Sequence, residues 1–118
     1  MSKFRIFYIK IVYFEAILLI SPEASKSILN DNLKTFEESI SNNSGKIKDS
    51  EDWGLRDLSY VINNFKKAFY KYYQLEIDGS NIKNITRILN QNDNIIRHLF
   101  IRVNEHQELP TNLNYEKN

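Results

Sequence analysis

The amino-acid sequence predicts one α+β domain whose strands and helices follow one another in the order βαββαβ. Short apolar or alternating runs mark four strands, and apolar repeats of three to four residues mark two helices. The chain has three glycines, two at joints between the expected elements and one inside an expected strand. Because local and overall patterns agree, we expect a four-stranded antiparallel sheet with both helices on one face, the ferredoxin-like arrangement.

The first strand is expected over Ile11–Ile20, an apolar run that ends at Ser21-Pro22. The same dipeptide is expected to open the first helix, with Pro22 in its first turn. Apolar residues then lie along one helical stripe, at Ile28, Leu29, Leu33, Phe36 and Ile40. The polar run after this stripe predicts the helix end, with Gly45 as a left-handed cap.

A long β-hairpin is expected next, with one strand running from Lys46 and the other over Phe69–Ile77. Gly54 interrupts the first of these strands and predicts a β-bulge. The loop is expected over Asn63–Ala68, longer than a two-residue turn, so that it projects from the body. Alternation on the second strand separates two sets of residues, Tyr73, Leu75 and Ile77 on one face and Tyr70, Tyr72 and Gln74 on the other.

The last third of the chain predicts a short helix, a strand and a tail. Asp78-Gly79-Ser80 breaks the preceding strand and can cap the helix, and Ile95–Val103 is the final strand. The folded domain is therefore expected over residues 1–103, and residues 104–118 are expected to form a flexible tail. Residues 1–10 are either an extension of the first strand or the product of a start assigned too early.

The composition of the chain restricts the classes of function that it can have. The chain carries 16 Lys and Arg against 15 Asp and Glu, a net charge of +1. A nucleic-acid binder that acts alone usually has a larger basic excess, so RNA binding here requires locally concentrated charge or a basic partner. There is no Cys, and the two His lack ligand spacing, so neither a disulfide nor a metal site is expected. Charged residues interrupt the apolar N-terminus, so no membrane segment is expected.

No catalytic constellation is found. The sequence holds no glycine-rich phosphate loop, no nucleophile elbow and no cluster of metal ligands. Neighbouring carboxylates at Glu37-Glu38 and Glu51-Asp52 point apart on a helix or strand, so neither pair forms an acid–base dyad. We therefore expect no enzyme, no cofactor and no small-molecule substrate.

Basic and aromatic residues on the expected sheet are the remaining candidates. Lys66 and Lys67 lie at the expected loop, and Arg97 and Arg102 flank the last strand. Aromatic side chains beside basic ones can stack bases and meet phosphates. Two interpretations stay open for Tyr70 and Tyr72, base stacking or packing, and two for the lysines, RNA contact or plain solvated charge.

Four segments, in order and at the right spacing, resemble one family. They are Phe14-Glu15 with Ser21-Pro22, the run Glu51–Arg56 followed by Leu58-Ser59-Tyr60, the run Tyr73–Glu76, and the run Asp93–Leu99. Together they resemble small-subunit ribosomal protein six of bacteria and organelles, from about residue 14 to residue 103. Departures are Asp57 where a basic residue is usual, Val61 for Pro, Ala68 for Gly, and Lys71 at an apolar position.

This resemblance implies a structural component of the small ribosomal subunit in the cytoplasm, acting in translation. It implies binding to small-subunit ribosomal RNA as a heterodimer with ribosomal protein eighteen, a small basic partner, in support of platform assembly. By matching positions it implies RNA or partner contacts for Arg56, Arg97 and Arg102. Lys66 and Lys67 are added on charge alone.

Two alternatives come from other classes of protein. An RRM-like module has the same element order and binds single-stranded RNA through exposed aromatic residues, to which the run Lys67–Tyr73 is loosely similar. A ferredoxin-like enzyme or small-molecule sensor is compatible with the fold alone. Tight binding of short single strands would favour the first alternative, and no residue constellation supports the second.

Overall fold

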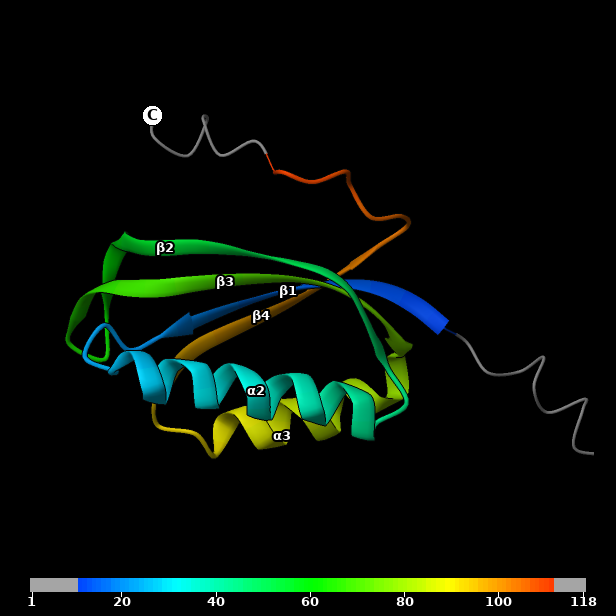
Figure 1. Cartoon of the computed structure of the whole chain (residues 1–118), viewed down its shortest axis with the longest axis horizontal. Helices are drawn as coiled ribbons and strands as arrows, with labels where there is room; N and C mark the ends of the chain where they lie inside the picture. The colour runs from blue at the N-terminus through cyan, green and yellow to red at the C-terminus, as the bar shows by residue number, and fades with distance from the viewer. Residues whose placement is uncertain (1–10, 112–118) are drawn as a thin grey trace, which may run out of the picture.

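The structure, a computed structural model, describes residues 11–111 and confirms the predicted βαββαβ order. Its elements are β1 (Ile11–Ile20), α2 (Lys26–Asn42), β2 (Lys46–Ile62), β3 (Phe65–Asp78), the 3-10 turn η1 (Gly79–Asn81), α3 (Ile82–Asn90) and β4 (Ile95–Val103). The strands form one antiparallel sheet in the order β2-β3-β1-β4. Both helices lie on one face of it, as expected (Figure 1). We call the opposite face the outer face.

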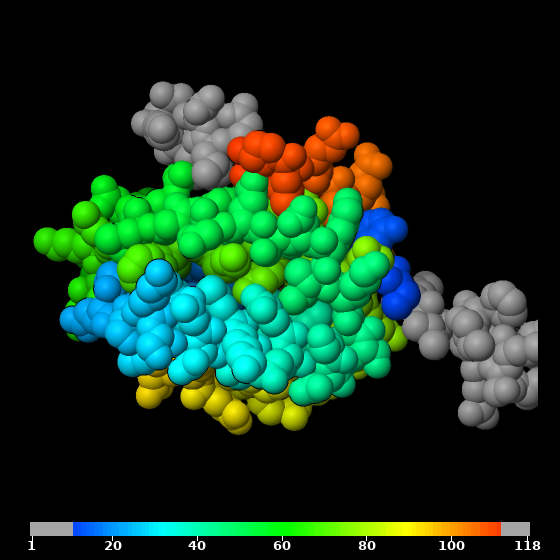
Figure 2. All heavy atoms as spheres, in the orientation of Figure 1, coloured from blue at the N-terminus to red at the C-terminus, as the bar shows by residue number. Residues whose placement is uncertain are grey.

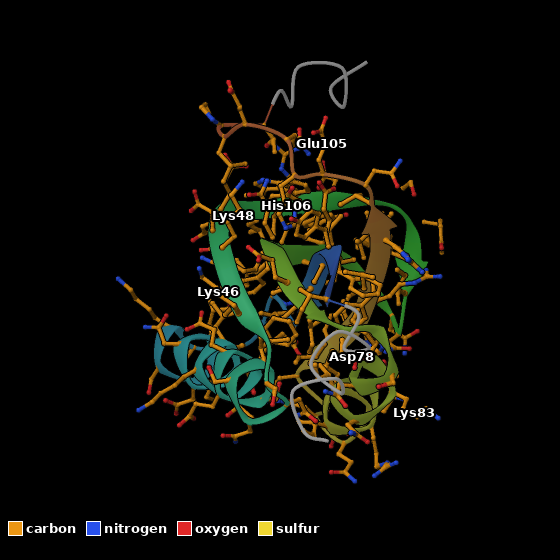
Figure 3. The ribbon with its side chains drawn as sticks, turned by 90° about the vertical axis from the view of Figure 1, so that its right-hand side faces the viewer. Lys46, Lys48, Asp78, Lys83, Glu105 and His106 are labelled. Atoms are coloured by element: carbon orange, nitrogen blue, oxygen red, sulfur yellow. The ribbon has the colours of Figure 1, made fainter. Side chains whose placement is uncertain are left out.

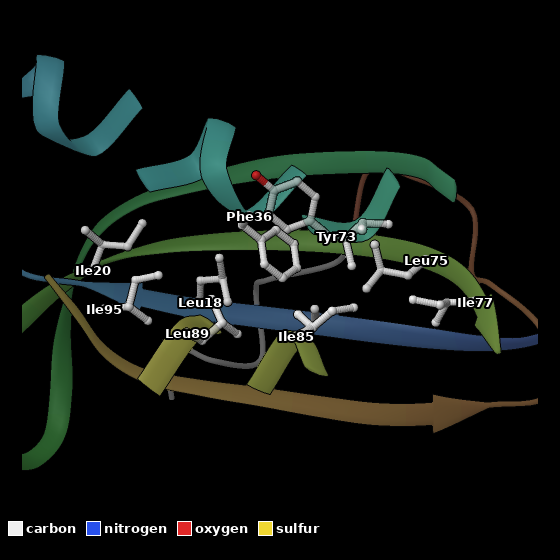
Figure 4. Close-up of a cluster of buried hydrophobic side chains, with 11 residues drawn as sticks. Leu18, Ile20, Phe36, Tyr73, Leu75, Ile77, Ile85, Leu89 and Ile95 are labelled. Atoms are coloured by element: carbon white, nitrogen blue, oxygen red, sulfur yellow. The ribbon is translucent and has the colours of Figure 1, made fainter. Parts of the chain in front are cut away.

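The hydrophobic core lies between the sheet and the two helices (Figure 4). Its buried members are Ala16, Leu18, Ile20, Phe36, Ile40, Tyr73, Leu75, Ile77, Ile85, Leu89 and Ile95. The predicted alternation on β3 is confirmed, because Tyr73, Leu75 and Ile77 all face this core. The Phe36 ring packs against the Tyr73 ring with centroids 4.8 Å apart. Tight packing of this kind fixes how the helices sit on the sheet.

The first helix ends in the predicted polar run, but its predicted start and its predicted left-handed residue need correction. Helix α2 begins at Lys26 rather than at Pro22, because Ser25 caps it by accepting a hydrogen bond from the Ile28 N–H. At the other end Ser44, not Gly45, takes the left-handed conformation, with φ of 61°. Gly45 is needed for a different reason. A Cβ there would lie 2.9 Å from side-chain atoms of both Ile40 and Ile77, so only glycine lets the chain pass.

The hairpin loop is also shorter than predicted. Ile62 pairs with Phe65, and the two residues between them, Asn63 and Asn64, have φ of 51° and 68°. Two left-handed residues are the pattern of a type I′ turn, which Asn tolerates well. The predicted bulge at Gly54 is confirmed by the register shift before it and by its φ of 75°.

The end of β2 bends away from a flat sheet. Asp57 pairs with Lys67 and Ile62 with Phe65, so β2 advances five positions (57 to 62) while β3 advances two (65 to 67). The extra length bends the strand, as bulges do, and the bend is visible at the left of Figure 1. It brings the Tyr60 hydroxyl to Arg97 on β4, although β3 and β1 separate the two strands in the sheet.

Candidate RNA and partner surface

The two lysines of the predicted loop lie on β3, next to the two-residue turn. Both are exposed, but successive strand residues point to opposite faces, so Lys66 and Lys67 do not form one patch. The Lys67 ammonium lies 3.8 Å from the carboxylate of Asp57, the residue that replaces a basic one in the family pattern. An exposed ion pair of this kind contributes little stability, and it leaves Lys67 with part of its charge offset.

Three of the five candidate residues share the outer face near the hairpin turn. Arg56 pairs with Ala68, and Lys66 lies two residues before Ala68, hence on the same side of the sheet. Arg97 reaches this face from β4, where it pairs with Leu19, which in turn pairs with Tyr70. The structure thus groups Lys66, Arg56 and Arg97 at one end of the sheet.

Two of these guanidinium groups are held in place. The Arg56 Nε donates a hydrogen bond of 3.2 Å to the Trp53 carbonyl. Arg97 donates to the Tyr60 hydroxyl, and its guanidinium lies 5.9 Å from the centre of the Tyr60 ring. The bent end of β2 therefore orients Arg97, a role that the sequence did not reveal.

Arg102 lies apart from this group. It is exposed and pairs with Phe14, which packs against the core, so Arg102 projects on the helix side of the sheet edge. It lies five positions after Arg97 along β4, roughly 17 Å away at the usual strand rise. Neither Arg102 nor Lys67 therefore lies on the outer face with the other three candidate residues, and the two lie apart from each other.

The outer face combines buried and exposed apolar residues. One row across the sheet joins Tyr72, Ile17 and Leu99, and the next joins Gln74, Glu15 and Ile101. Tyr72 is only 1% exposed, whereas Leu99 is 51% and Ile101 42% exposed. Other parts of the chain therefore cover the β3 end of each row, whereas the β4 end is open to solvent.

Part of that cover is Trp53, at the bulge beside Gly54. Its ring stacks on Tyr72 with centroids 5.1 Å apart and planes 10° from parallel. Its Nε1 donates a hydrogen bond of 3.0 Å to the Glu51 carboxylate. From the sequence, Trp53 was noted only as part of the segment that resembles the family. The predicted bulge beside it was nevertheless a signal that its ring would depart from the usual alternation between the two faces of a strand.

The rest of the cover is residues 104–111, which we call the strap. Figure 2 shows it in orange and red against the sheet, and Figure 3 places Glu105 and His106 on the side opposite the helices. The Gln107 carbonyl accepts a hydrogen bond of 2.9 Å from Gln74. Thr111 donates to the Glu51 carboxylate through its N–H at 3.0 Å and its hydroxyl at 2.6 Å.

These contacts show where the first part of the predicted tail lies. The strap runs from the end of β4 to β2, across the outer face. No hydrophobic period along residues 104–111 predicts this path. How freely the tail moves stays a prediction, and residues 112–118 and 1–10 lie outside the described residues.

The electrostatics of the outer face follow from the same contacts. Burial by itself raises the pKa of Glu51, but hydrogen bonds from the Thr111 side chain, from Trp53 and from the Thr111 backbone outweigh it and lower that pKa. Burial raises the pKa of the Tyr72 hydroxyl. Glu51 is thus held as a carboxylate and Tyr72 as a neutral phenol, which suits hydrogen bonding rather than acid–base chemistry.

Within residues 11–111 no group of three or more His, Cys, Asp or Glu is placed to hold a metal ion. In the same part of the chain, no helix has the length and apolar character that a membrane crossing needs.

Comparison with known proteins gives one consistent result. The model of the family "Ribosomal protein S6" matches residues 13–102. The small ribosomal subunit protein bS6 of Rickettsia felis is 32% identical over 101 residues, which cover 86% of this chain and 84% of the relative. Protein bS6 of Paracoccus denitrificans is 30% identical over 98 residues, 83% of this chain and 75% of the relative.

The fold agrees with these relatives. The crystal structure of 30S ribosomal protein S6 from Thermotoga maritima superposes with a TM-score of 0.75 at 22% identity, covering 92% of this chain and 94% of that one. The predicted family is confirmed, and with it a role at the cytoplasmic ribosome in translation. The chain belongs to the ribosomal protein S6 family and is a structural protein of the small ribosomal subunit rather than an enzyme.

Proposed function

We propose that this chain binds small-subunit ribosomal RNA together with ribosomal protein eighteen and thereby supports assembly of the subunit platform. The observation that carries the proposal is the division of the outer face. Lys66, Arg56 and Arg97 gather near the hairpin turn, and the exposed apolar residues Leu99 and Ile101 lie beside them on β4. A basic end suits phosphate, and an apolar surface suits a protein partner.

The basic end of the outer face, near the hairpin turn, contacts the RNA in this proposal. Arginine binds phosphate through charge-assisted, often bidentate hydrogen bonds, and a guanidinium already oriented by Tyr60 loses less freedom on binding. The mechanism is positional and involves no chemical step. Because the net charge is only +1, a few local contacts and a basic partner have to supply the electrostatic attraction.

Partner contact falls to the apolar part of the outer face. Glu15 lies in the same row as Ile101, and Glu51 pairs with Tyr72 in the row of Leu99. Carboxylates around an apolar patch favour a basic partner, by attraction during encounter and by rejection of acidic proteins. Ribosomal protein eighteen, implied by the family resemblance, has that character.

The arrangement of aromatic residues argues against the RRM-like alternative. Stacking of single-stranded bases requires exposed rings on the sheet. Tyr72 is 1% exposed beneath Trp53 and beside the strap, and Tyr70 is half-buried. These two tyrosines therefore serve packing, the second of the two interpretations that the sequence left open.

The RNA part is tested by the salt dependence of binding to a platform fragment of small-subunit RNA. Lys66→Gln and Arg97→Gln should each weaken binding and reduce the slope of log K against log salt by about 0.7–0.9 per lost phosphate contact. Lys83→Gln is the matched control, an exposed lysine on α3 at the opposite side of the sheet. Slopes equal to that of the control would reject RNA contact at this end.

The partner part is tested with a matched pair of exposed isoleucines. Ile101 on the outer face is 42% exposed and Ile28 on α2 is 43% exposed. Ile101→Asp should abolish binding of ribosomal protein eighteen in titration calorimetry, because it places a charge in an apolar contact, whereas Ile28→Asp should leave binding unchanged. Equal binding by both variants would remove the outer face as the partner surface.

A further inference from the structure

The strap occupies half of a surface whose other half is open. Where it crosses β3, Tyr72 and Gln74 are each 1% exposed. In the same rows on β4, Leu99 and Ile101 remain largely exposed. The outer face therefore carries apolar or aromatic residues on both sides of the boundary of the cover, with Glu15 and Gln74 among them.

The strap is attached by polar contacts that water can replace and by one ring contact, between His106 and Tyr13, whose centroids lie 5.0 Å apart. Gln74 donates to the Gln107 carbonyl, the Gln107 amide lies 3.3 Å from the Tyr72 hydroxyl, and a His106 ring nitrogen lies 3.1 Å from the Leu75 carbonyl. Four of its residues are exposed and charged or polar: Asn104, Glu105, Gln107 and Glu108. Hydrogen bonds exchanged with water contribute little net stability, unlike the apolar packing under the helices.

Covalent continuity with β4 nevertheless keeps the strap close to the sheet. A tethered segment binds its site at a high effective concentration, so weak contacts are enough to keep the site occupied most of the time. A partner that needs the covered rows then binds only the fraction of molecules in which the strap is open. Its apparent affinity is reduced by that fraction.

We propose that the strap is a displaceable cover of the outer face, closed in the isolated chain and lifted when a protein partner docks. The proposal deepens the proposed function and rests on it for the identity of that partner. When the strap lifts, Tyr72 and Trp53 join Ile17, Leu99 and Ile101 in one continuous docking surface.

Glu51 provides a means of observing the strap. Its carboxylate accepts hydrogen bonds both from Thr111 at the end of the strap and from Trp53. Opening of the strap therefore changes the surroundings of the only Trp in the chain. Trp53 fluorescence reports the state of the strap without an added label.

The decisive experiment locks the strap in the full-length chain. The natural sequence has no Cys, so Glu51→Cys with Thr111→Cys gives a protein in which a short bis-maleimide joins only these two positions. The same protein with both thiols capped by N-ethylmaleimide is the open control. The two forms share all their substitutions and differ only in the link.

In the isolated protein, the capped form should bind the apolar dye bis-ANS several-fold more tightly than the linked form. Acrylamide should also quench Trp53 several-fold more strongly in the capped form. A chain ending at Val103 should behave like the capped form, with circular dichroism confirming its fold. Equal dye binding and equal quenching in the linked and capped forms would overturn the proposal, whatever any partner does.

Ribosomal protein eighteen is then titrated into the same forms. If the open state is a minor one, linking should lower the affinity by about tenfold or more relative to the capped form. Equal affinities, or tighter binding by the linked form, would show that the strap does not compete and would overturn the proposal. If the partner binds no form, the proposed function fails, and the dye and quenching results alone decide the role of the strap.

Discussion

The two faces of the sheet are covered in opposite ways. The inner face is sealed by apolar side chains from α2 and α3, and its central residues, such as Leu18 and Leu75, are fully buried. The outer face is crossed by one polar strap and leaves Leu99 half-exposed. Because alternate residues of one strand serve different faces, the same strands can hold the fold together on one side and present a surface for binding on the other.

A matched pair of leucines should show the largest difference. Leu18 on β1 is fully buried in the core, and Leu99 on β4 is 51% exposed on the outer face. Leu18→Ala should lower the free energy of unfolding by about 2–5 kcal/mol, because it removes buried methyl groups and leaves a cavity. Leu99→Ala should lower it by less than about 1 kcal/mol. Urea denaturation followed by Trp53 fluorescence measures both, and similar losses would mean that the outer face also carries the fold.

Substitution of Gly45, which packs against the core, and of Gly54, on the edge strand β2, should destabilise the fold for different reasons. Gly45→Ala forces a Cβ against Ile40 and Ile77 and should lower the free energy of unfolding by about 1–3 kcal/mol. Gly54→Ala meets no atom within 4 Å, but its φ of 75° strains an alanine by about 1–2 kcal/mol.

Asparagine separates the two causes at these glycines. Asn tolerates the left-handed region, so Gly54→Asn should be milder than Gly54→Ala. Gly45→Asn should be at least as damaging as Gly45→Ala, because the clash remains. Thermal unfolding measures all four variants, and a rescue by Asn at Gly45 would contradict the packing argument.

Neighbouring tyrosines on β3 allow a comparison of single hydroxyl groups. Tyr73 donates a hydrogen bond of 2.7 Å to the Glu37 carboxylate on α2, whereas the Tyr72 hydroxyl accepts two from neutral amides, at 3.2 Å from Gln74 and 3.3 Å from Gln107. Tyr73→Phe should lower the free energy of unfolding by about 1.5 kcal/mol, since bonds to charged groups are the stronger ones. Tyr72→Phe should lower it by about 0.5–1 kcal/mol. Chemical denaturation of both variants measures the two losses of stability. A larger loss for Tyr72→Phe than for Tyr73→Phe would contradict this prediction.

The inner face explains why the sequence predicts the fold well. Its residues repeat with a period of two on strands such as β3, where Tyr73, Leu75 and Ile77 are buried, and of three to four on α2, and burial enforces these periods. The errors lie at the ends of elements, where single side chains decide. Ser25 capped the helix that Pro22 was expected to open, and two Asn residues closed a hairpin that was expected to need a longer loop.

The outer face explains why the candidate site is only partly predictable. Arg56, Lys66 and Arg97 are recognisable from charge and family position, but their grouping depends on strand register. The bend that brings Tyr60 to Arg97 arises from three-dimensional pairing and has no local signature. The position of the strap has no local signature either. Its polar residues follow no period, and their partners lie far away in the chain, as Glu51 does from Thr111.

On the outer face, acidification should produce the smallest of these effects. The pKa of Glu51 is lowered from its ordinary value of 4.5 in the folded chain, because the hydrogen bonds from Thr111 and Trp53 outweigh the effect of burial. A lowered pKa means that the stabilisation is fully present above the ordinary value and is lost as the pH falls through the lowered one. The strap should therefore be closed at neutral pH and should open progressively below about pH 4.5.

The expected change is small, because it involves the hydrogen bonds of a single carboxylate that is only partly buried. Acrylamide quenching of Trp53 between pH 7 and pH 3 measures it, with circular dichroism confirming that the core stays folded. Glu51→Gln should flatten the profile. Glu15, which faces Gln107, and the strap residues Glu105, His106 and Glu108 are also titratable, so Glu→Gln variants at positions 15, 105 and 108 and His106→Gln serve as controls. If Glu51→Gln retains the wild-type profile while one control flattens it, that other group governs the strap and the assignment to Glu51 is wrong.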